Sequence, residues 1–343
     1  MDFLNFLSSD NLAVVILLLI SGLALVLIGA EVLVDGSSKI AKKLGISDFV
    51  IGLSIVAIGT SAPEMVVSFL GAIQGKADIS VGNIVGSNIF NTAFVLGISA
   101  LIAPVLITRT NKRRDVPVNL IVTLLLFLCG MTGTLLALVG LGDSGFASNT
   151  ISRVEGAVFL LLFIGYMVWS FLSSEKSAED VQDPAKAKQI NVWISLIFII
   201  LGIVSLVFGG QVFVSSAEAI AHKAGLSDKF IAVTVLACGT SLPELATSVV
   251  AAIKGKGQMA IGNVLGSNVA NILLIVGGSA LIHPLSLDGI NLLDFAALGA
   301  LALHRNRDSP RGRRPRRRRG RTATARRRVR RAIRGNARTG SSD

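Results

Sequence analysis

Long apolar stretches separated by short polar segments dominate the pattern along this chain. A helix needs about 20 mostly apolar residues to cross a bilayer, and eight stretches reach that length. They cover about residues 11–34, 49–73, 79–107, 116–139, 154–172, 192–214, 230–253 and 259–282, and a ninth, shorter run covers about 290–303. The pattern therefore predicts an all-α integral membrane protein.

The polar residues inside these stretches form two copies of one pattern, 180 positions apart. Gly59–Glu64 reads GTSAPE, and Gly239–Glu244 reads GTSLPE. A second pattern, GN followed by GSN and a further Asn, begins at Gly82 and again at Gly262. Roughly half of residues 59–104 are identical in the second copy, which is the signature of an internal repeat.

Five predicted spans precede the polar segment 173–189, so the second copy should enter the membrane from the opposite face. Inverted repeats with interrupted helices are typical of secondary transporters. We expect a first repeat in 1–172, a cytoplasmic linker in 173–189, a truncated second repeat in 190–303 and a tail in 304–343. Lysines and arginines follow the first, third and seventh spans, so the positive-inside rule predicts that the N-terminus lies outside.

Composition agrees with a membrane protein, because 52% of the residues are hydrophobic and only 16% are charged. The net charge of +12 comes from the tail, since residues 304–343 contain 17 Arg and two Asp. We predict that this tail arises from a shifted reading frame and is disordered; a genuine basic tail that binds anionic lipid is the alternative. It lacks aromatic residues and an apolar face, so we expect no nucleic-acid partner.

Each copy of the repeat places a proline and several oxygen donors at membrane depth. Pro63 and Pro243 each remove a backbone N–H and should break the helix that contains them. The surrounding donors are carboxylate, hydroxyl and amide oxygens, which suit a hard cation such as Ca²⁺ and argue against copper or iron–sulfur chemistry. These candidates are Thr60, Ser61, Glu64, Ser87 and Asn91, with Thr240, Ser241, Glu244, Ser267 and Asn271 in the second copy.

Several of these residues also have structural interpretations. A single buried Glu beside a proline can be a hydrogen-bonded kink residue, although two in register favour function. The GxxxG spacings at Gly82 and Gly262 favour helix packing. Glu31 and Asp35 should be solvated at a membrane edge. The asparagines Asn83, Asn88, Asn263 and Asn268 either bond to loosened backbone or bind an ion.

The doubled GTSxPE and GNxxGSNxxN motifs resemble the two alpha repeats of the cation/calcium exchanger superfamily, which contains the sodium/calcium exchangers and their prokaryotic relatives. The resemblance covers about residues 10–303 and implies ten helices in two inverted halves, of which the tenth is missing here. It implies antiport by alternating access, with Glu64 and Glu244 as central ligands. The hydroxyls of Thr60, Ser61, Thr240 and Ser241 and the carbonyls of Ala57 and Ala237 would contribute ligands, and Ser87, Asn91, Ser267 and Asn271 would complete the ion sites. Relatives often carry Asp at the position of Asn271, so K⁺ dependence stays open.

We therefore predict an antiporter that exchanges Ca²⁺ for Na⁺ in the inner membrane, and neither an enzyme nor a cofactor-binding protein. Ca²⁺, Na⁺ and the lipid bilayer are its expected partners, and we expect a monomer. H⁺ is the alternative counter-ion, because each Glu could carry a proton. A cation channel is a further alternative, which the doubled helix breaks disfavour.

Overall fold

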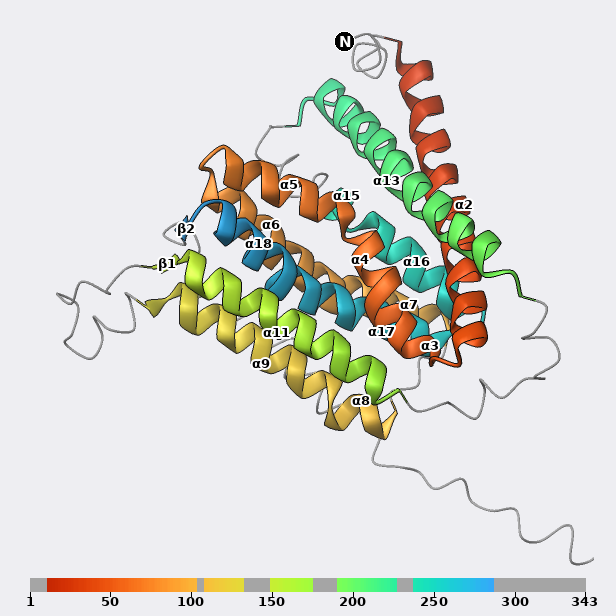
Figure 1. The fold of residues 1–343 in the computed structure, drawn as a ribbon. Helices are drawn as coiled ribbons and strands as arrows, with labels where there is room; N and C mark the ends of the chain where they lie inside the picture. The colour runs from red at the N-terminus through yellow and green to blue at the C-terminus, as the bar shows by residue number, and fades with distance from the viewer. Residues whose placement is uncertain (1–10, 104–107, 133–148, 175–189, 227–236, 287–343) are drawn as a thin grey trace, which may run out of the picture. The chain divides into compact units, whose positions relative to one another are not determined.

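The computed structural model describes residues 11–103, 108–132, 149–174, 190–226 and 237–286, all within the compact unit Met1–Asn306. The predicted run 290–303 and the tail 304–343 lie outside these residues. The described part is almost entirely helical (Figure 1). Its one sheet pairs β1 (Thr150–Ile151) antiparallel to β2 (Leu285–Ser286). The helices, with π-helical segments written η, are α2 (Leu12–Leu44), α3 (Asp48–Ile51), η1 (Gly52–Val56), α4 (Ala57–Thr60), α5 (Ala62–Ile73), α6 (Ala77–Phe90), η2 (Asn91–Val95), α7 (Leu96–Ile102), α8 (Arg109–Arg113), α9 (Asp115–Gly130), α11 (Arg153–Leu172), α13 (Val192–Lys223), α15 (Ala237–Thr240), α16 (Leu242–Ile253), α17 (Gly257–Val269), η4 (Ala270–Val276) and α18 (Gly277–Ile282).

Five of the described helices are long and apolar enough to cross a membrane, and one bent pair adds a sixth span. The first and sixth predicted spans were too short, because α2 has 33 residues and α13 has 32. Both helices continue into polar sequence. In α2 the Asn11 side chain caps the first turn, and Gly45 ends the helix with φ 67°, a left-handed conformation that glycine adopts without strain.

Helices α2 and α13 cross each other closely and run antiparallel. A Cβ added at Gly29 would lie 2.9 Å from the carbonyl oxygen of Gly202, and one at Gly209 would lie 3.0 Å from that of Gly22. Gly202 and Gly209 lie 180 positions after Gly22 and Gly29, so the inverted repeat makes the two contacts equivalent. Small residues at these points allow the two backbones to meet, as in many membrane helix pairs.

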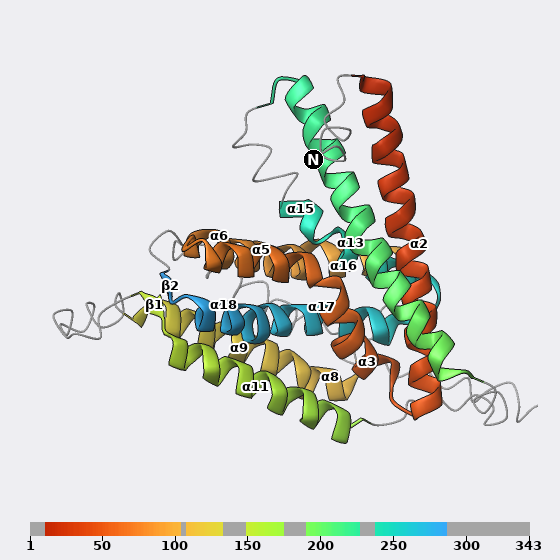
Figure 2. The same cartoon turned by 45° about the horizontal axis from the view of Figure 1, so that its top comes forward.

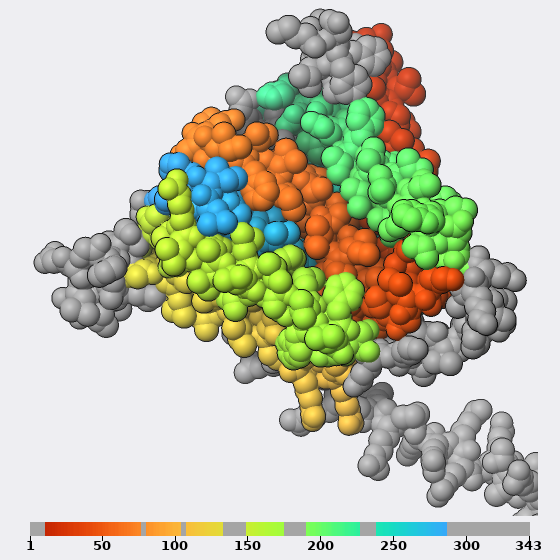
Figure 3. All heavy atoms as spheres, in the orientation of Figure 1, coloured from red at the N-terminus to blue at the C-terminus, as the bar shows by residue number. Residues whose placement is uncertain are grey.

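The helix formed by α17, η4 and α18 lies at the centre of the described fold. Figure 2 shows it between a layer that contains α5 and α6 and a layer that contains α9 and α11. Figure 3 shows α18 as a narrow blue strip between α5 and α11. Cβ atoms added at Gly262 and Gly266 would lie 2.2 Å from the carbonyl oxygens of Phe49 and Leu53. The predicted packing role is therefore confirmed for these two glycines.

The halves repeat each other in backbone detail as well as in sequence. Gly45 and Gly225 have φ of 67° and 76°, and Gly75 and Gly255 have φ of 68° and 73°. Each pair is separated by the repeat offset. The equivalent helices α2 and α13 run antiparallel, so the second half is inverted relative to the first. The fold therefore consists of two inverted repeats, as the sequence predicted.

The positive clusters predicted to share one side of the membrane lie at one end of the described fold. Lys256 pairs with Asp48 at 2.7 Å, which joins the turn before α17 to α3. The Asn111 amide of α8 donates to Gln258 at 3.2 Å. The end of α11 reaches the same region, because the Ser47 backbone N–H donates to Ser174 Oγ at 3.1 Å. The basic segments after the first, third and seventh spans therefore lie together, beside the start of the linker.

Candidate ion site

A helix break precedes each intramembrane glutamate, as the prolines predicted. In the first half α4 ends at Thr60, Ser61 leaves the helical conformation with φ −80° and ψ 11°, and α5 begins. The two parts of this span are bent by 51°. In the second half Ser241, with φ −90° and ψ 8°, separates α15 from α16. Each proline lies in the first turn of the following helix, where its missing N–H costs no hydrogen bond.

The two glutamates are fully buried and each is bound by the other half of the chain. Ser61 Oγ donates to Glu244 Oε1 at 2.8 Å, and Ser241 Oγ donates to Glu64 Oε1 at 3.1 Å. Both carboxylates have an exposed fraction of 0%. The repeat offset exchanges these two hydrogen bonds, so the breaks meet about a common centre.

The third and eighth spans add one further serine to each carboxylate. Ser87 Oγ donates to Glu64 Oε1 at 3.4 Å, and Ser267 Oγ lies 3.5 Å from Glu244 Oε1. The backbone oxygen of Ala57 lies 3.5 Å from the same Ser267 hydroxyl. One oxygen of each carboxylate thus accepts from two serines, one from each half of the repeat.

Five oxygens of the predicted site residues are buried without a hydrogen-bond partner among the described residues. They are Glu64 Oε2, Glu244 Oε2, Thr240 Oγ1, Asn91 Oδ1 and Asn271 Oδ1. A buried polar group left unpaired costs about 1–3 kcal/mol, and a cation bound among such oxygens would remove that cost. Carboxylate, amide and hydroxyl oxygens are ligands that Ca²⁺ accepts in flexible geometry.

The remaining predicted residues are placed less directly. Thr60 Oγ1 lies 3.3 Å from the Ala57 oxygen and donates to Asn263 Oδ1 at 3.2 Å. Asn271 donates to Asn88 Oδ1 at 3.0 Å, which fixes its amide. Ala237 is the first residue of α15, and its side chain lies outside the described set. The structure thus links Thr60 to the Glu244 backbone through Asn263, whereas Asn271 is paired with Asn88.

Two asparagine–serine pairs bond to the backbone at the helix breaks. The sequence analysis named the asparagine of each pair but missed the serine. The Asn83 amide donates to the Glu64 backbone oxygen at 3.4 Å and to Ser68 Oγ at 3.2 Å. The Asn263 amide donates to the Glu244 backbone oxygen at 3.3 Å and to Ser248 Oγ at 2.9 Å. Bonding to loosened backbone is therefore confirmed for both asparagines. Ser68 and Ser248 could have been found, because they are identical across the repeat offset.

The fold and the site together define a membrane transporter of the inverted-repeat class. A family model described as sodium/calcium exchanger protein matches residues 14–172 and 194–304. The chain therefore belongs to the sodium/calcium exchanger protein family, whose members are transporters and not enzymes.

Individual relatives agree over most of their length. The sodium/calcium exchanger MaX1 of Methanosarcina acetivorans is 34% identical over 304 residues, which cover 80% of this chain and 85% of the relative. The inner membrane protein YrbG of Escherichia coli is 31% identical over 278 residues, covering 79% and 81%. A solved structure of the sodium-calcium exchanger NCX_Mj superposes with a TM-score of 0.70 at 32% identity, covering 85% of this chain and 89% of that one. These matches support cation antiport as the activity of this chain.

Proposed function

We propose that this chain exchanges Ca²⁺ for Na⁺ across a membrane by alternating access, with Glu64 and Glu244 as the central ion ligands. The observation that carries the proposal is the reciprocal pairing of Ser61 with Glu244 and of Ser241 with Glu64. Each ligand group depends on the opposite half, so a movement of one half against the other would change both at once. The same pairing argues against two independent kink residues.

Charge balance explains how one site could serve both ions in turn. Two buried carboxylates repel each other, and one Ca²⁺ or two Na⁺ would neutralise them. The hydroxyls of Thr60, Thr240 and the four serines would supply neutral ligands, as would the side-chain oxygens of Asn91 and Asn271 and the carbonyls of Ala57 and Ala237. Because the ions compete for the same carboxylates, binding is mutually exclusive, as antiport requires.

The counter-ion has a second candidate in H⁺. Each of the two buried glutamates could take up a proton in place of Na⁺. K⁺ dependence is less expected, since Asn271 keeps an oxygen ligand but cannot ionise. Sodium is the first choice because the chain belongs to a family that is described as sodium/calcium exchanger protein.

Ca²⁺ uptake into proteoliposomes under imposed gradients tests this proposal. We expect an outward Na⁺ gradient to drive uptake without K⁺ on either side. Uptake driven only by a proton gradient would identify H⁺ as the counter-ion in place of Na⁺. Loss of uptake without K⁺ would contradict the expectation, drawn from Asn271, that transport does not need K⁺. Equal uptake with no opposing gradient would show a channel and refute antiport.

We also propose that the protein lies in the inner membrane, with its N-terminus outside and the linker 173–189 in the cytoplasm. The support is the gathering of three basic segments at one end of the fold, which the positive-inside rule assigns to the cytoplasm. Protease digestion of right-side-out vesicles should leave the linker intact, and cleavage within it from outside would reverse this orientation.

A further inference from the structure

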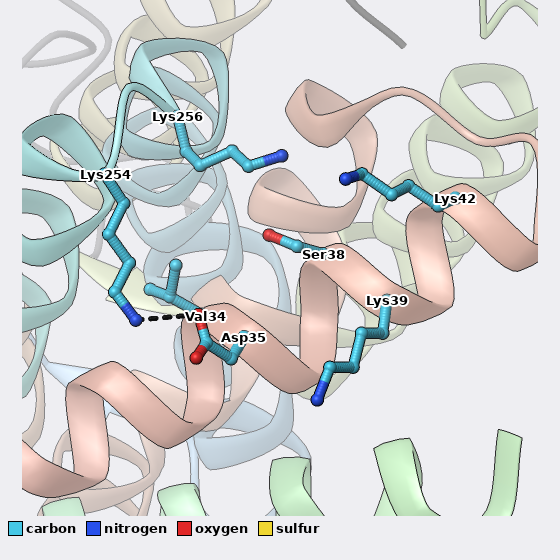
Figure 4. Close-up of a pocket in the computed structure, with 7 residues that line it drawn as sticks. All are labelled: Val34, Asp35, Ser38, Lys39, Lys42, Lys254 and Lys256. Carbon is cyan, nitrogen blue, oxygen red and sulfur yellow. Dashed lines mark hydrogen bonds and ion pairs between the residues drawn. The ribbon is translucent and has the colours of Figure 1, made fainter. Parts of the chain in front are cut away.

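A cavity of about 430 Å³ lies at the basic end of α2, separate from the buried glutamates (Figure 4). One wall is the last three turns of α2, and the other is the turn between α16 and α17. Its lining residues are Val34, Asp35, Ser38, Lys39, Lys42, Lys254 and Lys256. Four lysines and one aspartate give it a net positive charge, which favours an anionic ligand.

The four lysines differ in how they are held. Lys254 pairs with Asp35 at 2.7 Å and with Glu31 at 3.1 Å, while Lys256 pairs with Asp48. Glu31 and Asp35 are half exposed, as expected, but their common partner was not foreseen. Lys39 and Lys42 have no carboxylate partner among the described residues; the Lys39 ammonium lies 4.7 Å from the centre of the Phe198 ring. Two positive charges are therefore left uncompensated beside the cavity.

Ser38 supplies an independent sign of a ligand. It lines the cavity with an exposed fraction of only 8%, and its hydroxyl has no hydrogen-bond partner within the described ranges. Figure 4 shows Ser38 beside the ammonium groups of Lys42 and Lys256, which point toward each other across the opening. A buried, unpaired hydroxyl flanked by ammonium groups matches the donors that bind a phosphate oxygen.

We propose that this cavity binds the phosphate headgroup of an anionic membrane phospholipid. Apolar surface adjoins it on both walls: Ile28, two turns earlier on α2, is 56% exposed, and Ile253, next to Lys254, is 65% exposed. A ligand that follows this surface needs acyl chains as well as a phosphate. Basic pockets between membrane helices are known to recognise such headgroups.

The inverted repeat shows that the fold does not require these lysines. At the equivalent positions of the other half, Lys39 becomes Ala219, Lys42 becomes His222 and Lys254 becomes Gln74. Ser38 becomes Glu218, a carboxylate that would repel a phosphate. This set of basic side chains is thus not repeated at the equivalent positions of the other half, and it lies at the end of the fold that carries the other basic segments.

Lipid binding to the purified full-length chain tests the proposal. Native mass spectrometry in detergent would compare added phosphatidylglycerol with phosphatidylcholine, and inorganic phosphate would be tested in parallel. We expect preferential binding of phosphatidylglycerol. The double variant Lys39→Ala, Lys42→Ala should bind it about 30-fold more weakly, since each lysine near the headgroup contributes about 1 kcal/mol. These lysines are chosen because they hold no described ion pair, so the fold should persist.

The repeat and a neighbouring residue supply the controls. Lys43 follows Lys42 but does not line the cavity, and Lys76 occupies the position equivalent to Lys256 in the first half. The double variant Lys43→Ala, Lys76→Ala removes the same charge and should bind phosphatidylglycerol normally. Equal weakening in both double variants would show a general charge effect and overturn the proposal. So would equal binding of the two lipids, or binding of inorganic phosphate without lipid preference.

Discussion

The third and eighth spans carry the same motif but lie in different surroundings. In the apolar window of Ser80–Ile102 39% of the residues are buried, against 94% in that of Gly257–Ile282. The second of these helices is covered by α9 and α11. Asn119 of α9 donates to the Leu265 oxygen at 3.4 Å, and a Cβ at Gly156 of α11 would lie 2.7 Å from the Gly277 oxygen. Both covering helices precede the linker in sequence, so the cover of one half comes from the other half.

The predicted site residues are equally buried on both spans, despite this difference in how the spans are covered. Ser87 and Asn91, on the less covered span, have exposed fractions of 2% and 0%, and Ser267 and Asn271 have 0%. The inner face of each span is buried by the two broken helices, whereas the outer face depends on α9 and α11. The burial of these site residues therefore does not depend on the cover that α9 and α11 give to the eighth span.

The largest effect should come from the paired carboxylates, and it should be equal in the two halves. Glu64→Gln and Glu244→Gln each remove a ligand charge while they keep the shape of the side chain. We expect either change to abolish Na⁺-driven Ca²⁺ uptake in proteoliposomes, with expression and membrane insertion unharmed. Near-normal uptake by either variant would identify that glutamate as a structural kink residue.

Asn83 and Asn263, which bond to the backbone of the two glutamates, should distinguish the two halves, because they make different numbers of hydrogen bonds. Asn263 and Asn83 make the same two donations, but Asn263 also accepts from Thr60. Groups that orient a ligand are typically worth 10–100-fold in metal affinity. We expect Asn83→Ala to raise the Ca²⁺ concentration for half-maximal uptake by about 10-fold, and Asn263→Ala by nearer 100-fold. Asn119→Ala is the control, and equal effects at 83 and 263 would contradict the asymmetry.

Substitution of the equivalent glycines Gly86 and Gly266 should show directly that the eighth span is more tightly covered than the third. A Cβ at Gly266 would lie 2.2 Å from the Leu53 oxygen, whereas one at the equivalent Gly86 meets no described atom within 4 Å. Overpacking costs about 1–3 kcal/mol, so Gly266→Ala should lower the thermal unfolding temperature measurably and Gly86→Ala should not. Matching losses would mean that the third span is packed as tightly as the eighth.

The smallest effect should come from Lys254, which the first half replaces by Gln74. Burial lowers the pKa of Lys254, but Asp35 and Glu31 outweigh this and raise it above its ordinary value. The charged pair therefore stabilises the fold at neutral pH, and this stability is lost only as pH rises through the raised pKa. Lys254→Gln should cost less than about 1 kcal/mol, and the loss should shrink in high salt. A larger, salt-independent loss would show a packing role instead.

The sequence alone determined the repeat, the helix breaks and the identity of the central polar residues. Membrane depth leaves few reasons for a carboxylate beside a proline, and the offset of 180 residues supplied a second, independent copy of the signal. The same offset would have identified Ser68 and Ser248. The ends of α2 and α13 were misjudged, because hydropathy marks where a helix leaves the membrane and not where it ends.

The tertiary structure alone decided which hydroxyl meets which carboxylate. Ser61 is three residues from Glu64 in sequence, yet it donates to Glu244, because the bend at each break turns the serine toward the opposite half. It also decided that α9 and α11 cover the second repeat and that Lys254 joins α16 to α2. These contacts join residues more than 120 positions apart. Their partners depend on how whole helices pack, and no local pattern of apolar and polar residues carries that information.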